Sequence, residues 1–268
     1  MKTLFAIGGA ANAEDPVLFR EFIRRAGGEA ARLVIFPQAS ILADTGEYYR
    51  KIFKDLGVHR DPVVLEFRAR PEADLPLHLE AVRAATGIFF AGGTQMRLAA
   101  LFGGTALEAE LLAAYQRGAV VGGTSAGAAI LSRVMLAYGK GGATPRERMA
   151  QFSPGLGFAD RIIFDQHFRQ RDRLGRLAYA VAMHPGYLGV GVDENTAAII
   201  EDGTHLTVVG RHAVTIVDGR SVTASNVAEV AGSRPVAISG LTVHVLTAGC
   251  TYNLRDREAH IPRPALEG

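Results

Sequence analysis

Short apolar runs alternate with longer amphipathic stretches through the first half of the chain. Strands are predicted at Leu4–Ile7, Leu33–Phe36, Val63–Phe67, Ile88–Ala91 and Ala119–Val121. Helices are predicted at Asp15–Arg25, Thr45–Leu56, Leu75–Ala85, Thr94–Leu101 and Leu107–Arg117, with another beginning at Ser125. Because strands that alternate with helices pair in parallel through right-handed crossovers, this half predicts a doubly wound α/β sheet.

The pattern changes after about residue 188, where short strands are separated by turns. These strands are predicted at Thr196–Ile200, Leu206–Val209, Val214–Val217, Val227–Val230 and Val243–Leu246. No Pro- or Ser-rich linker separates the two regions. We therefore predict one domain over residues 1–268, a mostly parallel sheet to which the strands after about residue 188 add as hairpins.

Composition narrows the class of protein. Hydrophobic residues make up 48% of the chain and charged residues 21%, which excludes a disordered or collagen-like chain. The net charge of +2 comes without a long basic run, so neither nucleic acid nor a membrane surface is a predicted partner. The single cysteine, Cys250, excludes an internal disulfide and a cysteine-based zinc cluster. Since Gly8-Gly9 interrupts the first apolar run, we predict a first strand rather than a secretion signal, and a cytoplasmic protein.

A G-x-S-x-G sequence, Gly123-Thr124-Ser125-Ala126-Gly127, lies between a predicted strand and a predicted helix. A sharp strand-to-helix turn exposes a serine hydroxyl at the strand end, and flanking glycines relieve the steric clashes there. A tight turn that merely packs closely would have the same letters. The strand–turn–helix context favours a nucleophile, Ser125, because the first N–H groups of a helix can stabilise an oxyanion.

A serine nucleophile needs a base, and His167 is the candidate. It follows the apolar run Ile162–Phe164, so it is predicted at the same sheet edge as Ser125. The other histidines are interpreted as structural. Arg169, Arg173 and Arg176 follow His167 at helical spacing, and their guanidinium groups would pair with a carboxylate of the substrate.

Three segments resemble the cyanophycinases, within the serine peptidase family that also holds aspartyl dipeptidase. They are Gly122–Ala128, the block from Asp165 to Leu177, and Val192–Ala197; Gly8-Gly9, Phe90–Gln95 and Gly155–Phe158 extend the likeness over roughly residues 4–200. The resemblance implies a three-layer, class I glutamine-amidotransferase-like (flavodoxin-like) fold, often a homodimer. It also implies hydrolysis of cyanophycin, a polyaspartate carrying arginine on each β-carboxyl, to β-Asp-Arg dipeptides.

Site residues transfer by motif position. The resemblance makes Ser125 the nucleophile and His167 the base, with oxyanion N–H groups from Ala126 and Gly93. It places Gln95, Asp165, Gln166, Arg171, Arg173 and Arg176 around the substrate. Arginines would bind aspartyl carboxylates, and acids such as Asp165 would bind substrate guanidinium groups. No metal or organic cofactor is predicted.

The third member of the triad departs from the family pattern. The family carries an acid just ahead of a Pro-Arg pair, whereas the residues before Pro145-Arg146 contain none, and Glu147 follows the pair. Glu147, or another acid, would orient His167. Asp193-Glu194-Asn195 fits either a pocket rim or a turn between strands. Two alternatives stay open: a dipeptidase acting on short aspartyl peptides, and a catalytically silent protein that binds aspartyl-arginine ligands.

Overall fold

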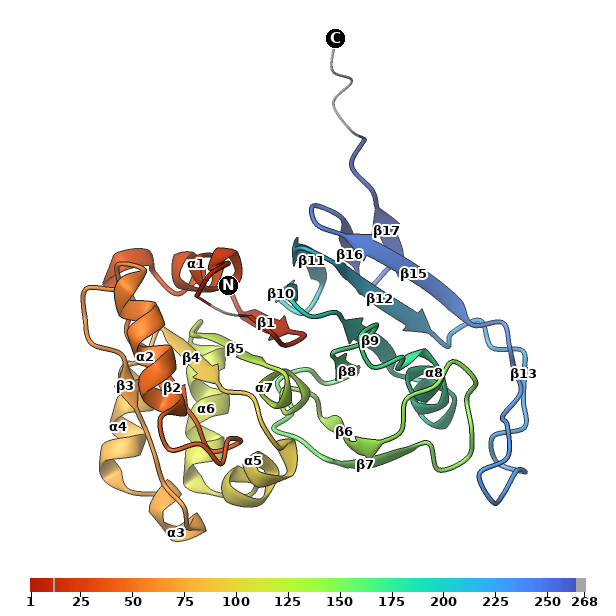
Figure 1. Ribbon diagram of the computed structural model, residues 1–268, viewed down its shortest axis with the longest axis horizontal. Helices are drawn as coiled ribbons and strands as arrows, with labels where there is room; N and C mark the ends of the chain where they lie inside the picture. Colours follow the sequence, from red (N-terminus) through yellow and green to blue (C-terminus); the bar gives the residue numbers. More distant parts are fainter. Residues whose placement is uncertain (12, 264–268) are drawn as a thin grey trace.

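A computed structural model describes residues 1–11 and 13–263, and two β-sheets form its centre (Figure 1). Among these residues the larger sheet has the order β17-β16-β11-β10-β1-β5-β4-β2-β3. Its strands are β1 (Thr3–Ile7), β2 (Leu33–Phe36), β3 (Val63–Val64), β4 (Gly87–Phe90), β5 (Val120–Thr124), β10 (Thr196–Glu201), β11 (His205–Gly210), β16 (Thr251–Asn253) and β17 (Glu258–His260). The first five pair in parallel, and β10 adds antiparallel to β1. The chain therefore has a mixed α/β fold.

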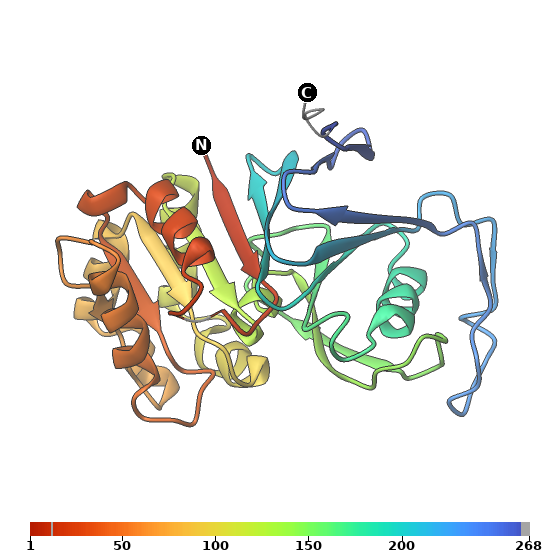
Figure 2. The same ribbon diagram turned by 45° about the horizontal axis from the view of Figure 1, so that its top comes forward.

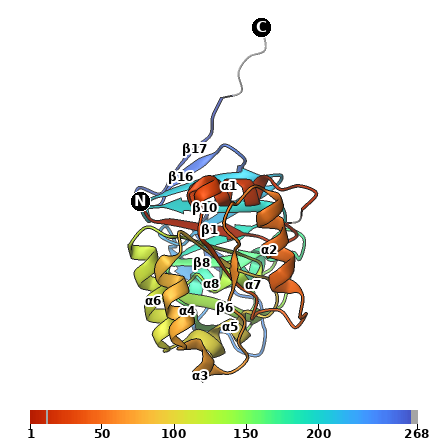
Figure 3. The same cartoon turned by 90° about the vertical axis from the view of Figure 1, so that its left-hand side faces the viewer.

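Helices cover both faces of the parallel strands (Figure 3). One face carries α1 (Val17–Arg25) and α2 (Thr45–Asp55), and the other carries α3 (Arg70–Ala73), α4 (Pro76–Ala84), α5 (Gln95–Phe102) and α6 (Ala106–Gln116). Alternate side chains of a strand point to opposite faces, so Phe5 and Ile7 pack with α1 and α2, whereas Leu4 and Ala6 pack with α4 to α6. Runs that are apolar at every position thus become strands buried on both sides.

The smaller sheet has the order β15-β12-β9-β8 and lies beside the larger one (Figure 2). Its strands are β8 (Ile162–Gln166), β9 (Leu188–Val192), β12 (Ala213–Asp218) and β15 (Thr242–Thr247). Ile163 packs with α8 (Leu174–Met183), whereas Phe164 and Val190 share a core with Ile200 and Val208 of the larger sheet. The two sheets therefore enclose part of one hydrophobic core.

The structure corrects the sequence interpretation in two places. We expected the strands after about residue 188 to join one sheet; of the predicted strands, β10 and β11 do, but β12 and β15 form the smaller sheet with β8 and β9. The strands β9, β16 and β17 were not predicted. Val227–Val230 is a turn rather than a strand, because it belongs to an arm, residues 219–241, whose valines pack on the core around α8. The arm carries the short pair β13 (Ala224–Ser225) and β14 (Ile238–Ser239) and lies at the right of Figure 1.

A hairpin that the sequence interpretation missed lies next to the candidate site. It pairs β6 (Val134–Gly139) with β7 (Ala150–Pro154), and a bulge interrupts its register between Leu136 and Tyr138. Its strands mix exposed and buried positions, which weakens the period-two signal. This hairpin frames the cavity described below.

Within the described part of the chain, no single helix is both long and apolar enough to cross a membrane. The pair α5 and α6 would meet length and composition only together, across a bend of 103°.

Candidate active site

Ser125 occupies a strained turn between β5 and the short helix α7 (Ala126–Ala129). Its backbone has φ 53° and ψ −112°, a conformation that costs a non-glycine residue on the order of 1–3 kcal/mol. A Cβ on Gly127 would overlap the backbone of Phe90 in β4, so only glycine allows this close approach. The turn is held by a hydrogen bond from Ser125 N–H to the Ile7 carbonyl, 2.9 Å long. The strand–turn–helix context predicted for the G-x-S-x-G sequence is therefore present.

His167 comes to Ser125 from the other sheet. It directly follows β8, and its Nε2 lies 2.8 Å from Ser125 Oγ. Its backbone N–H donates to the Gly8 carbonyl at 2.7 Å, which ties the end of β8 to the end of β1. Gly9, at φ 116°, leaves room for the imidazole, because a Cβ there would overlap the ring. The structure thus brings together two residues that are 42 positions apart in the sequence.

Glu194 completes the arrangement. Its Oε1 lies 2.6 Å from His167 Nδ1, and it sits in the turn between β9 and β10. The neighbours fix this turn: Asp193 accepts hydrogen bonds from the N–H groups of Arg169 and Ala213, and Asn195 N–H donates to Gly9. Asp193-Glu194-Asn195 is therefore a strand connection that also presents a carboxylate to His167. The family resemblance includes this segment, so the sequence indicated that it could lie near the site. No sequence feature showed that Glu194, rather than Asp193 or Asn195, would contact His167.

Glu147, the acid predicted to orient His167, lies elsewhere. Its Oε2 accepts a hydrogen bond from Ser233 N–H at 3.2 Å, and its Oε1 pairs with Arg148 at 3.0 Å. Its own N–H donates to the Arg234 carbonyl. The prediction for Glu147 is wrong because the loop after Pro145 is bound to the arm 219–241, while His167 Nδ1 is already occupied by Glu194.

A cavity of about 430 Å³ opens beside Ser125. Most of the predicted site residues line it: Gly93, Gln95, Ser125, Gln166, Arg171, Arg173 and Arg176. The other lining residues, which include Tyr138, were not predicted. Tyr138 is half exposed on β6 and adds an aromatic surface to the rim. Arg169 lies before α8 and does not line the cavity beside Ser125; it lines a neighbouring cavity with Phe168 and Asp193, and Arg173 borders both cavities.

Asp165 forms the base of the arginine cluster rather than a binding group. Its carboxylate is fully buried and accepts hydrogen bonds from Arg176 Nε at 2.6 Å, from Arg176 Nη2 and from Arg173 Nη1 at 3.2 Å. The expectation that Asp165 contacts a substrate guanidinium is therefore wrong. One buried carboxylate between two guanidiniums leaves a net positive cavity wall, and the exposed Arg171 adds to it.

Burial changes the pKa of one arginine in this wall without removing its charge at neutral pH. Desolvation lowers the pKa of Arg173 to about 10, although Asp165 opposes the shift. Arg173 therefore stays charged at neutral pH. A cationic wall of this kind attracts carboxylates, and the guanidinium N–H groups that Asp165 does not occupy can bind them.

Gln95 and Gly93 line the cavity beside Ser125, and Ala126 directly follows that serine. Gln95 Nε2 donates to the carbonyls of Leu136 and Ala137 at 2.9 and 2.8 Å, which leaves its own carbonyl oxygen for another partner. Gly93 lines the cavity with Ser125, and Ala126 is the first residue of α7. An N–H at the first helical position has no acceptor within its helix, so it is free to bind an anion.

The electrostatics of His167 suit a general base. Burial lowers its pKa, an effect that the hydrogen bond from His167 Nδ1 to Glu194 partly offsets. The imidazole is therefore neutral near pH 7. The hydrogen-bond partners assign its proton to Nδ1, facing Glu194, and leave Nε2 to accept the Ser125 proton. Among residues 1–11 and 13–263, no group of three His, Cys, Asp or Glu side chains is arranged to hold a metal ion.

Comparison with known proteins agrees with this arrangement. The sequence pattern of peptidase family S51 matches residues 4–209. A cyanophycinase from Synechococcus elongatus is 42% identical over 262 residues, covering 95% of this chain and 80% of the relative. A cyanophycinase from Geminocystis herdmanii (strain PCC 6308) is 37% identical over 270 residues, covering 98% and 97%.

Solved structures share the fold. A peptidase from an acI-B1 actinobacterium superposes with a TM-score of 0.67 at 21% identity, over 95% of this chain and 97% of that one. A putative peptidase E from Listeria monocytogenes EGD-e gives a TM-score of 0.52 at 17% identity, over 79% and 99%. At these identities the likeness concerns the fold alone.

Proposed function

Because the chain belongs to peptidase family S51, we propose that it is a serine-type peptidase that hydrolyses cyanophycin to β-Asp-Arg dipeptides. The observation that carries the proposal is the continuous hydrogen-bonded chain Ser125–His167–Glu194 beside a cationic cavity. The relatives named cyanophycinase supply the polymer as the substrate. The cavity chemistry fits it, since each arginyl unit of the polymer carries a free carboxylate that Arg171, Arg173 and Arg176 can bind.

The mechanism follows from the positions of the protons. Ser125 Oγ attacks the carbonyl between two aspartyl residues while its proton moves to His167 Nε2. The N–H groups of Ala126 and Gly93 stabilise the oxyanion. His167 returns the proton to the leaving amine, which departs and leaves an acyl-enzyme. Water, deprotonated by His167, then releases the acid product and restores the serine. Glu194 holds the imidazole in the Nδ1–H form and stabilises its protonated state.

The alternative function is that of a dipeptidase that acts on short aspartyl peptides. One cavity of about 430 Å³ beside Ser125 would also hold a dipeptide. The silent-binding alternative was motivated by the absence of an acid before Pro145, and Glu194 at 2.6 Å from His167 weakens that motive.

The test compares wild type with Ser125→Ala. Both are incubated with insoluble cyanophycin and with Asp-X dipeptides, and released β-Asp-Arg and free aspartate are measured. We expect the wild type to release β-Asp-Arg and to turn over dipeptides more slowly, and Ser125→Ala to do neither. Equal release by both proteins would refute the assignment, and faster dipeptide turnover would favour the alternative function.

Four further features belong to this proposal. We keep the doubly wound glutamine-amidotransferase-like class and the single-domain organisation, which the sharing of site residues between the two sheets supports. We also keep a homodimer and a cytoplasmic location. Sedimentation equilibrium of the full chain and fractionation of the source cells test these last two features.

A further inference from the structure

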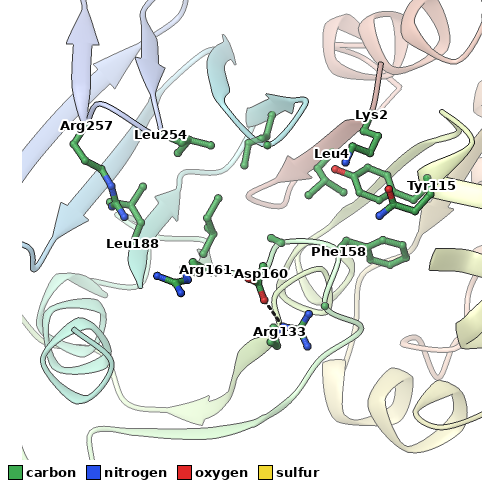
Figure 4. A pocket seen from close by; sticks show the side chains of 16 residues that line it. Lys2, Leu4, Tyr115, Arg133, Phe158, Asp160, Arg161, Leu188, Leu254 and Arg257 are labelled. Carbon is green, nitrogen blue, oxygen red and sulfur yellow. Dashed lines mark hydrogen bonds and ion pairs between the residues drawn. The ribbon is translucent and has the colours of Figure 1, made fainter. Parts of the chain in front are cut away.

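A second cavity, of about 470 Å³, lies at the opposite ends of the strands (Figure 4). Leu4, near the start of β1, and Leu188, the first residue of β9, both line it. The far ends of the same strands lead to Gly8-Gly9 and to Glu194. A five-residue strand puts on the order of 13 Å between the two sets of strand ends. This cavity is therefore separate from the one beside Ser125.

The floor of the cavity is apolar and joins both sheets. It is formed by Leu4, Phe158, Ile162, Leu188, Ile200 and Leu254. Leu4 and Ile200 come from β1 and β10 of the larger sheet, and Ile162 and Leu188 come from β8 and β9 of the smaller one. A volume of this size with an apolar floor is typical of sites for small organic molecules.

The rim of the cavity is cationic. In Figure 4, the side chains of Arg161 and Arg257 extend toward its open space. Arg161 is exposed, and its guanidinium has no hydrogen-bond or ion-pair partner among the described residues, although its backbone carbonyl accepts from Leu188 N–H. The buried Nη1 of Arg257 lies 3.6 Å from Asp218 Oδ1 and has no acceptor in normal hydrogen-bond geometry among those residues. Lys2 adds a third cation, while Arg133 pairs with the carboxylate of Asp160.

The apolar floor and the cationic rim together indicate which class of ligand the cavity would bind. A neutral apolar molecule would leave the guanidinium groups unused, and a bare inorganic anion would leave the apolar floor in contact with water. An excess of cations over acids raises the local concentration of anions. We propose that this cavity is a second binding site, for a small organic anion with an apolar body, such as an aryl-alkyl carboxylate.

Binding at this place has a physical consequence for the fold. The ligand would contact both sheets at once, so it would stabilise their present packing by mass action. The expected sign is a rise in the thermal midpoint that grows with ligand concentration. The inference does not depend on the catalytic role of Ser125, because none of its residues lies beside that serine.

The experiment uses two probes of the same shape on the full chain: 4-phenylbutyrate and its neutral amide. Isothermal titration calorimetry and thermal unfolding are measured with each probe. We expect saturable binding of the carboxylate with a Kd at or below ~1 mM, and ~10-fold weaker binding of the amide. At equal concentration the carboxylate should raise the thermal midpoint more than the amide does.

Three variants locate the bound probe. Arg161→Met should weaken carboxylate binding ~10-fold, and this exposed, unpaired side chain is not needed for folding. Arg255→Met, an exposed arginine outside the cavity, is the matched control and should bind as wild type does. Arg171→Met should also bind as wild type does. No saturable binding, unchanged binding in Arg161→Met, or loss of binding in Arg171→Met would each overturn the proposal, the last by placing the probe beside Ser125.

Discussion

The two sheets contribute different halves of the candidate triad. The larger sheet supplies Ser125 through a strained turn after a parallel strand, and the smaller sheet supplies His167 and, after β9, Glu194. The nucleophile is therefore defined by local backbone geometry, which a short motif encodes. The base and its acid depend on how one sheet packs against the other, which no short motif encodes.

Backbone hydrogen bonds join the two halves. Gly8 accepts from His167 N–H at 2.7 Å, and Gly9 accepts from Asn195 N–H, in the turn after β9, at 2.9 Å. We call Gly8-Gly9 with these partners the seam. The seam consists of main-chain groups. A substitution at Gly8 or Gly9 would therefore act mainly through the space that the new side chain occupies.

The largest expected effect is at the base. His167→Ala should lower the turnover of cyanophycin by ~10⁴–10⁶, about as much as Ser125→Ala, because the two groups act as one unit. The double variant should lose no more than either single variant. Turnover of all three, measured by release of β-Asp-Arg, checks this; additive losses would show that the two sheets contribute independently.

The next effect concerns the stability of the smaller sheet. Asp165→Asn removes the carboxylate that pairs with two buried guanidiniums, so the free energy of unfolding should fall by about 3–5 kcal/mol. Urea denaturation measures it. Asp160→Asn is the matched control, since its ion pair with Arg133 is exposed and should contribute less than ~1 kcal/mol. Equal losses in the two variants would contradict the buried-cluster interpretation.

A smaller effect is expected at the seam. Gly9→Ala places a Cβ against the His167 ring and should displace it from Ser125, lowering kcat by ~10² with little change in KM. Gly57→Ala is the control, because Gly57 also has positive φ, at 95°, but faces open space. It should lose stability without losing activity. Full activity in Gly9→Ala would show that the seam does not position the imidazole.

The smallest effect is a shift in pH dependence. Burial lowers the pKa of His167 below its ordinary value of 6.5, and the base must be neutral to act. Activity should therefore be complete above the lowered pKa and fall as the pH decreases through it, so the acid limb of kcat/KM should have its midpoint below 6.5. In Glu194→Gln the midpoint should move lower still, because Glu194 raises this pKa. A midpoint above 6.5 in wild type would contradict the burial argument.

The same contrast explains what could be read from the sequence. Alternating strands and helices predicted the parallel half, and strand-end positions predicted both Ser125 and His167. The partition of β9, β12 and β15 into a second sheet could not be predicted, since pairing partners depend on tertiary packing. Glu194 was missed for the same reason: its distance from His167 is set by the seam, not by the 27 positions between them. Glu147 was chosen by position along the chain, and its loop is bound by the arm instead.

The most direct test of the two-sheet triad compares Glu194→Gln with Glu147→Gln. Each variant and the wild type are treated with a serine-directed fluorophosphonate, and the rate of labelling at Ser125 is followed by intact mass. We predict that Glu194→Gln is labelled ~10³–10⁴-fold more slowly than wild type, because the imidazole loses its orienting acid, and that Glu147→Gln is labelled at the wild-type rate. Wild-type labelling in Glu194→Gln together with slow labelling in Glu147→Gln would contradict the account.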